Sequence, residues 1–238
     1  MARQAASSTS IPRTTLASMV GERIRSDIID GVLRPGTQLN EVELAAGFGV
    51  SRGPVREATQ RLIQEGLLRS EPHRGIFVPM LEAADIEDIY LAREALETAA
   101  LRRVTGTSRA ASAYDTLDGI VQAMESAEKS DDWQTVVSRD LDFHSALVKA
   151  AGSPRLERMF TTVISETRLC LVMLTDAYGR EDLVRRRDDV VWEHRQILDL
   201  VRADDVEGAV ALLKKHFDGA MGTLERRMGA DTETPSAG

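Results

Sequence analysis

The chain has 238 residues, 42% of them hydrophobic and only 4% aromatic, and carries a formal net charge of −8. That length allows two modest domains with mainly aliphatic cores, which favours helices over sheets. Residues 1–10 are small and polar, the apolar run at 169–174 is too short for a bilayer and Cys170 is the only cysteine, so we expect a cytoplasmic protein with no membrane partner.

The charge is unevenly divided along the chain. Residues 1–79 contain ten arginines and eight acidic residues, a net charge of +2, whereas the remaining residues carry −10. Such a division is typical of a DNA-binding domain joined to an acidic domain that DNA repels, although a net charge of +2 is small. Residues 1–13 are rich in Ser, Thr and Ala and are predicted to be disordered, and a first helix is predicted over 15–29.

The most informative run is Val50 to Leu62. Its apolar residues lie on one helical stripe, Ser51 is a plausible N-cap, and Pro54 falls in the first turn, where a missing N–H costs little. Arg52 and Arg56 are one turn apart near the N-terminus, outside that stripe. A shorter amphipathic segment capped by Asn40 and a glycine turn precede it, which together indicate a helix-turn-helix. A surface helix with solvated arginines is the alternative.

A hairpin is predicted directly after this helix. Two short β-prone runs, 67–71 and 76–78, flank the turn Pro72-His73-Arg74-Gly75. In a winged helix-turn-helix this hairpin would be the wing, with Arg74 at its tip within reach of phosphate or the minor groove.

Several motifs in this part resemble the winged-helix reader of the GntR family of bacterial transcription regulators. They are Gly31-Val32-Leu33-Arg34-Pro35-Gly36, Leu39-Asn40-Glu41, Gly49 to Ala58, and Glu65-Gly66-Leu67. The resemblance implies DNA contacts in three segments: Arg34, then Ser51, Arg52, Gly53, Pro54 and Arg56, then Arg74 and Gly75 of the wing. Gly53 departs from the threonine of many relatives. Val42 stands where fatty-acid-responsive members carry an arginine, so that contact is not carried over.

From about residue 80 to 228 the pattern is helical throughout, and we expect an antiparallel bundle of six helices. The predicted helices cover residues 84–104, 108–129, 131–152, 154–178, 181 or later to 203, and 205–228, and Gly179 is expected to end the fourth. Asp131 is the expected cap of the third helix, and Ser153-Pro154 the opening of the fourth. Residues 229–238 are expected to be a disordered tail.

Four polar residues interrupt the apolar stripes of this bundle. Asp140 and His144 complete the stripe of the third helix, while His194 and His216 fall on the inner sides of the fifth and sixth. A single inward histidine is more often a core residue bonded to a backbone carbonyl, but four polar groups with no shared partner would each cost about 1–3 kcal/mol. An i, i+4 pair with one histidine from each of two other helices therefore predicts a divalent metal site.

The same set resembles the metal-binding motif of the FCD effector domain, which accompanies GntR readers in the FadR-like branch. Three imidazoles, one carboxylate and no thiolate favour Zn²⁺, with Ni²⁺, Mn²⁺ or Co²⁺ possible. Open coordination positions would accept a small carboxylate effector. Arg93 in Tyr90 to Glu97, which resembles the family's Arg-x-x-Leu-Glu signature, is the candidate effector clamp, with a helix-surface ion pair as its alternative. Arg168 is a weaker candidate for the same role.

These observations predict a homodimeric regulator that binds a palindromic operator and responds to a small organic acid at the metal. That it is a repressor, released from the operator by the acid, is what the family resemblance implies. Two rivals remain open from the sequence. A metal-dependent enzyme would use the open positions to activate water, but no inward general base is evident. A regulator whose metal is purely structural would respond to no acid.

Overall fold

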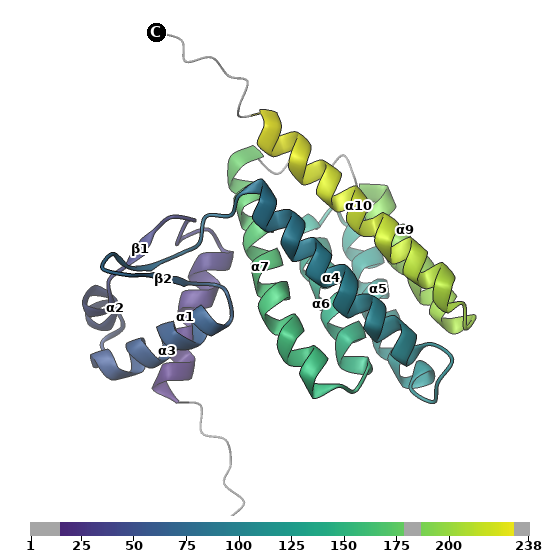
Figure 1. The fold of residues 1–238 in the computed structure, drawn as a ribbon, viewed down its shortest axis with the longest axis horizontal. Helices are drawn as coiled ribbons and strands as arrows, with labels where there is room; N and C mark the ends of the chain where they lie inside the picture. The colour runs from purple at the N-terminus through teal and green to yellow at the C-terminus, as the bar shows by residue number, and fades with distance from the viewer. Residues whose placement is uncertain (1–14, 179–186, 231–238) are drawn as a thin grey trace, which may run out of the picture.

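The computed structural model describes residues 15–178 and 187–230, with side chains described over 15–173 and 189–222. The predicted tail 1–13, residues 231–238 of the predicted tail 229–238, and Gly179 as the predicted helix terminator lie outside the described residues. Figure 1 shows two lobes: the reader, made of α1 to β3, and the body, made of α4 to α10. No helix in the described part of the chain combines the length and hydropathy needed to cross a membrane.

The reader contains the predicted helix-turn-helix. After α1 (Leu16–Ile29), α2 (Glu41–Phe48) begins at Asn40, whose side chain accepts a hydrogen bond from the Val42 N–H. Gly49 ends α2 in the left-handed conformation with φ of 65°, which glycine adopts without steric cost. Ser51 occupies the N-cap position of α3 (Arg52–Gln64), but its side chain makes no capping hydrogen bond.

The predicted wing is present and contains one strand more than expected. β2 (Arg69–Glu71) and β3 (Gly75–Phe77) pair antiparallel, and β1 (Gln38–Leu39) adds to the other edge of β3, so the strand order is β1-β3-β2. A two-residue strand carries too little alternation to be recognised in a sequence. Gly75 has a φ of 109°, which lets the tip of the wing turn.

The body is the predicted bundle of long helices. In chain order they are α4 (Ala83–Val104), α5 (Ala110–Lys129), α6 (Trp133–Ala150), α7 (Pro154–Tyr178), α9 (Arg187–Arg202) and α10 (Val206–Ala230). Asp132, not Asp131, caps α6, because Asp131 takes a positive φ of 63° and turns the chain. The last helix continues to Ala230, two residues into the predicted tail.

Each lobe has its own aliphatic core. In the reader, Ile24, Ile28, Val55 and Leu62 are almost fully buried between α1 and α3. In the body, the core is formed by residues from each of the helices that the structure describes there, among them Phe143 and Phe217. Helix α7 runs beside α1 as well as α4 and α6, so it is the body element that meets the reader.

Candidate metal centre and DNA-contacting helix

Three helices of the body bring the four predicted ligands together. Asp140 and His144 lie one turn apart on α6, His194 lies on α9 and His216 on α10. One ligand atom from each residue lies within 4.8 Å of all the others. Asp140 Oδ1 is 3.3 Å from His194 Nε2 and 3.8 Å from the Nε2 atoms of His144 and His216. The three imidazoles therefore converge through the same ring nitrogen.

The other ring nitrogen of each histidine is already hydrogen-bonded. His144 Nδ1 lies 2.5 Å from Glu97 Oε2, and His216 Nδ1 lies 2.9 Å from Glu193 Oε2. His194 Nδ1 lies 2.7 Å from the Val190 carbonyl oxygen, the bond expected of an ordinary core histidine. An Nδ1–H donated to each of these oxygens leaves the Nε2 lone pair free, which is the usual arrangement around a bound metal.

Electrostatics put two of the four ligands, Asp140 and His194, in the charge states that a metal requires. Burial opposes ionisation of Asp140, but the hydrogen bond to His144 and the nearby His194 and His216 outweigh it and hold the pKa of Asp140 far below its usual range. Burial lowers the pKa of His194 to about 3, so its imidazole is neutral at pH 7. For His144, burial lowers the pKa but the nearby Glu97 outweighs burial and raises it, so a cation would have to displace a proton there. An ionised carboxylate and neutral imidazoles are the forms that coordinate cations.

The spacing of the donors fits a transition-metal ion. Two atoms bound at about 2.0–2.1 Å lie roughly 2.9 Å apart when the angle between them is 90°, as in an octahedral site, and roughly 3.3–3.4 Å apart when the angle is tetrahedral. The Nε2 atoms of His144 and His194 are 3.3 Å apart, as are His194 Nε2 and Asp140 Oδ1. The Nε2 atoms of His144 and His216 each lie slightly farther from Asp140 Oδ1, at 3.8 Å. Without a cation, one of the Nε2 atoms of His144 and His194 must carry a proton to hydrogen-bond the other, whereas a bound cation would accept both lone pairs.

Arg93 is buried beside this cluster and is not the surface ion pair that was its alternative. Its side chain is 2% exposed, and its Nε donates to Glu97 Oε1 at 3.1 Å. The guanidinium lies over the rings of Tyr90 and Phe217, and Nη2 has no hydrogen-bond partner among the described residues. Burial disfavours its charge, but Glu97, Tyr90 and Asp140 outweigh burial and raise the pKa of Arg93. A buried donor without a partner is costly and suits a ligand oxygen.

The second effector candidate lies elsewhere. Arg168 on α7 lines a cleft at the junction of reader and body, together with Arg25 of α1 and Arg139 of α6. Neither Arg93 nor any of the four candidate ligands lines that cleft. The sequence cannot show this separation, because it depends on how α7 is rotated against its neighbours.

Two residues that support the cluster had no role in the sequence analysis. Glu97 orients His144 and pairs with Arg93, while Glu193 orients His216. Both are buried. The sequence did contain a feature that could have revealed them: both glutamates lie on the apolar side of α4 and α9, where an unpaired carboxylate would not be stable.

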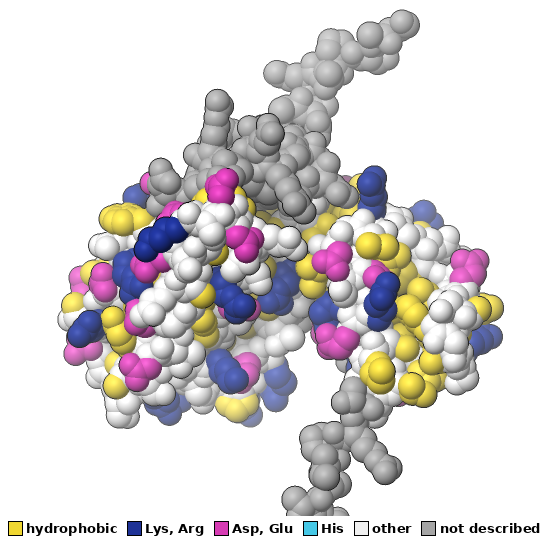
Figure 2. Space-filling view, turned by 180° about the vertical axis from the view of Figure 1, so that it is seen from behind, with side chains coloured by type: hydrophobic (Ala, Val, Ile, Leu, Met, Phe, Trp, Pro, Cys, Tyr) yellow, Lys and Arg dark blue, Asp and Glu magenta, His cyan; other side chains and the backbone are white. Residues whose placement is uncertain are grey.

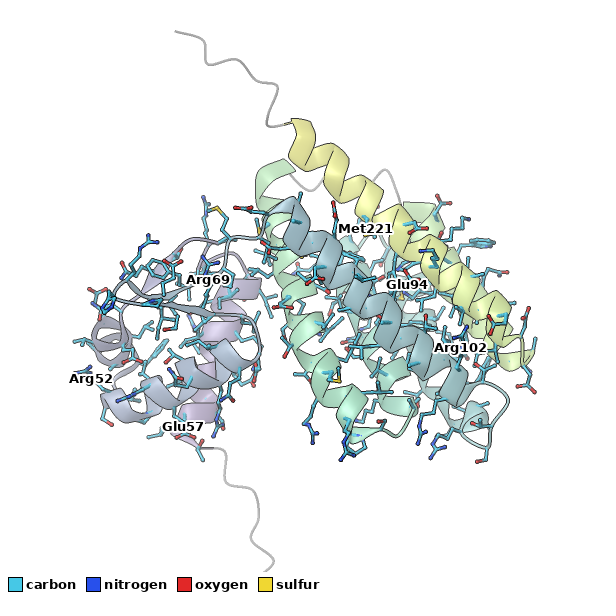
Figure 3. The ribbon with its side chains drawn as sticks, viewed as in Figure 1. Arg52, Glu57, Arg69, Glu94, Arg102 and Met221 are labelled. Atoms are coloured by element: carbon cyan, nitrogen blue, oxygen red, sulfur yellow. The ribbon has the colours of Figure 1, made fainter. Side chains whose placement is uncertain are left out.

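The start of α3 is exposed as the DNA-contact prediction requires. Arg52 and Arg56 are exposed while Val55 between them is buried, and Arg52 lies at the outer edge of the reader, away from the body (Figure 3). A Cβ on Gly53 would meet no atom within 4 Å, so packing does not explain this glycine. Ser51 and Pro54 flank it at the exposed N-terminus of the helix.

The remaining predicted DNA contacts lie on neighbouring surfaces. Arg34 is exposed in the turn after α1. Arg74 is exposed at the tip of the wing, next to Gly75, and pairs with Glu71 at 2.5 Å while its guanidinium lies over Phe77. Arg74 would have to exchange Glu71 for phosphate on binding DNA.

A winged helix-turn-helix joined to a helical body with a buried Asp/His cluster defines a DNA-binding regulator with a candidate metal centre. Comparison with known families agrees: the model of bacterial regulatory proteins of the gntR family matches residues 16–78, and the FCD domain model matches residues 88–219. The chain belongs to the GntR family of transcription regulators, in the branch that carries an FCD domain. This is a family of regulators and not of enzymes, so the metalloenzyme rival is set aside.

Its relatives include two named repressors and one solved structure. A protein of Paenarthrobacter nicotinovorans described as a probable D-xylose utilization operon repressor is 32% identical, with 89% of each chain covered. The gluconate operon repressor of Bacillus licheniformis is 27% identical over 90% of this chain and 87% of its own. A GntR regulator of Rhodococcus sp. RHA1 is 32% identical, with a TM-score of 0.69 over 87% of this chain and 96% of that chain.

Proposed function

We propose that this protein is a homodimeric repressor whose operator affinity falls when a small organic acid binds at a divalent metal in the body. The observation that carries the proposal is the convergence of four ligand atoms within 4.8 Å beside a buried arginine with a free donor. The proposal that the protein represses transcription, and does not activate it, is supported by the names of the two relatives above. We also propose the division into a reader over 14–79 and a body over 80–228.

Asp140, His144, His194 and His216 would hold the metal, with Zn²⁺ favoured and Ni²⁺, Mn²⁺ or Co²⁺ as alternatives. Four protein ligands leave one or two positions on a five- or six-coordinate ion. The test is elemental analysis of the purified protein beside a His194→Ala, His216→Ala double variant. About one metal per chain in the wild type and none in the variant is expected, whereas a metal-free wild type that takes up none of the four ions would overturn the proposal.

The effector would be a small carboxylate that binds the metal with one end and accepts a hydrogen bond from Arg93 Nη2 with the other. Glu97 and two aromatic rings hold Arg93 rigid, so binding does not require a loss of conformational entropy by this side chain. The experiment is operator release, followed by fluorescence anisotropy of labelled DNA, across a panel of mono-, di- and tricarboxylic acids. If no acid releases the operator while the protein still contains metal, the metal is structural.

For the DNA contacts, we propose that Arg52 and Arg56 reach base edges and phosphates from the N-terminus of α3. Gly53, Pro54 and Ser51 would let the backbone approach the duplex closely, with Arg34, Arg74 and Gly75 contacting the neighbouring backbone. Two copies of the reader would match the two halves of a palindromic operator. Footprinting on the region upstream of its own gene would show two protected half-sites about one helical turn apart, or multiples of one, if this arrangement is right.

A further inference from the structure

The cleft between reader and body is a candidate ligand site separate from the metal centre. It has a volume of about 520 Å³, which is within the usual range for small-molecule sites. Arg25 of α1 and Glu65 at the end of α3 line it from the reader, and residues of α6 and α7, with Ile120 of α5, line it from the body. Figure 2, which views the molecule from behind, shows Lys and Arg side chains at this junction.

Arg168 is one of four cationic residues that line the cleft. Its side chain is partly buried, and it makes no hydrogen bond or ion pair with any residue in the described part of the chain. Burial lowers the pKa of Arg168; the charge of Asp142 only partly offsets this, and Arg25 adds to the lowering. A guanidinium that has lost water without gaining a partner is a natural receptor for an anion.

The neighbouring acids are already engaged by other cations. Glu65 pairs with Arg25 at 2.5 Å, and Asp142 pairs with Arg139 at 2.8 Å. Lys149 adds a further positive charge at the rim, and Glu157 is the remaining acid that lines the cleft. The charge around Arg168 that is not neutralised by these ion pairs is therefore positive and can attract an anionic ligand.

The floor of the cleft is mainly apolar, whereas its rim is charged. Phe160 and Ile164 of α7 are 3% and 5% exposed, and Ser165 beside them is 6% exposed. A ligand that fills the cleft would cover this apolar floor while its anionic group meets the arginines. An inorganic ion alone would use only part of the site.

We propose that this cleft binds a small molecule that joins one anionic group, a carboxylate or a phosphate, to an apolar body. Helix α6 carries the candidate metal ligands Asp140 and His144 on one face and the cleft residues Arg139, Asp142 and Ser145 on another. The two sites therefore share a helix but no residue. Because Arg25 belongs to the reader, a bound molecule would also bridge the two lobes.

The test is calorimetric titration of the full-length protein with phenyl phosphate, benzoate and inorganic phosphate, repeated in the presence of a chelator. Phenyl phosphate or benzoate is expected to bind more tightly than inorganic phosphate, and binding is expected to survive chelation. Arg168→Gln should weaken binding by tenfold or more, on the order of one lost charge-assisted hydrogen bond. Arg139→Gln, which changes a half-exposed residue, should weaken it less.

The matched control is Arg158→Gln, which changes an exposed arginine of the same helix that does not line the cleft. It should leave binding unchanged, and circular dichroism should show all variants folded. The proposal is overturned if none of the three probes binds, if binding disappears with the metal, or if Arg168→Gln and Arg158→Gln behave alike. Loss of metal uptake alone would instead contradict the proposed effector centre and leave this cleft intact.

Discussion

Leu169 and Cys170 are adjacent on α7, yet their side chains lie in different hydrophobic cores. Leu169 is 1% exposed and packs with the reader core around Ile24 and Leu62, whereas Cys170 is 1% exposed and packs in the body core. Consecutive helical residues point about 100° apart, so one helix fills both cores. Any rotation of α7 caused by ligand binding in the body would move a residue inside the reader.

Leu169→Ala is therefore expected to destabilise the reader and to loosen its attachment to the body. Loss of a fully buried leucine costs about 2–5 kcal/mol of unfolding free energy. Urea denaturation followed by circular dichroism measures the change. Met159→Ala is the control, because Met159 lies on the same helix and is 60% exposed, so its change should stay below about 0.5 kcal/mol. Equal effects of the two substitutions would show that Leu169 does not join the lobes.

Gly66→Ala is expected to be unfavourable for two separate reasons. Gly66 has a φ of 77°, which costs a residue with a Cβ about 1–2 kcal/mol, and its Cβ would lie 2.8 Å from Glu166 Cγ. Thermal unfolding of Gly66→Ala and of the double variant with Glu166→Ala separates the two costs, because only the contact is relieved in the double variant. Gly47→Ala, in a helix and with no atom within 4 Å, should be neutral or stabilising.

Glu166 should make stability depend on pH at this junction. Burial, together with Asp85 and Asp88, raises the pKa of Glu166. A carboxyl whose pKa is raised in the folded state contributes stability below its unfolded pKa, and that contribution is lost as pH rises through the folded pKa. Glu166→Gln is therefore expected to raise the free energy of unfolding at pH 8, by less than about 1 kcal/mol because the group is only partly buried, and to have no effect near pH 4. Thermal unfolding at the two pH values measures the change through Tm. A gain of equal size at both pH values would rule out titration of Glu166 as the cause.

Glu97→Gln is expected to weaken metal binding about 10–100-fold, because it removes the carboxylate that orients His144 and increases its basicity. Competition with a chromogenic zinc chelator measures this affinity. Glu94→Gln is the matched control: Glu94 lies on the same helix (Figure 3), and its side chain pairs with Lys214 instead of with a residue of the cluster. If both variants bind zinc as the wild type does, Glu97 has no part in the centre.

Arg56→Ala is expected to reduce operator affinity by about 1–3 kcal/mol, the usual contribution of a bidentate base contact. Electrophoretic mobility shift assays at a fixed salt concentration measure the ratio of the dissociation constants of the variant and the wild type. Arg61 on the same helix provides the control, because it is ion-paired with Glu57 and lies further from the N-terminus. An affinity change within about twofold for Arg56→Ala would contradict the assignment of α3 as the recognition helix.

The sequence by itself determined the helices, the hairpin of the wing and the membership of the Asp/His cluster, but not the two-residue strand β1. Helical period places Asp140 and His144 on one apolar face, and the same period puts His194 and His216 on the inner faces of their helices. Gly49 and Asn40 likewise determined the turn and the start of α2 through local backbone preferences. These inferences needed only residues within a few turns of each other.

The tertiary structure alone decided which side chains from different helices meet. It placed Glu97 on His144, buried Arg93 between two rings, moved Arg168 into a separate cleft and put Leu169 in the reader core. The physical reason is that the period of a helix specifies a face but not its partner. Which neighbour that face meets depends on the rotation and crossing angle of packed helices, and many distant contacts set these together.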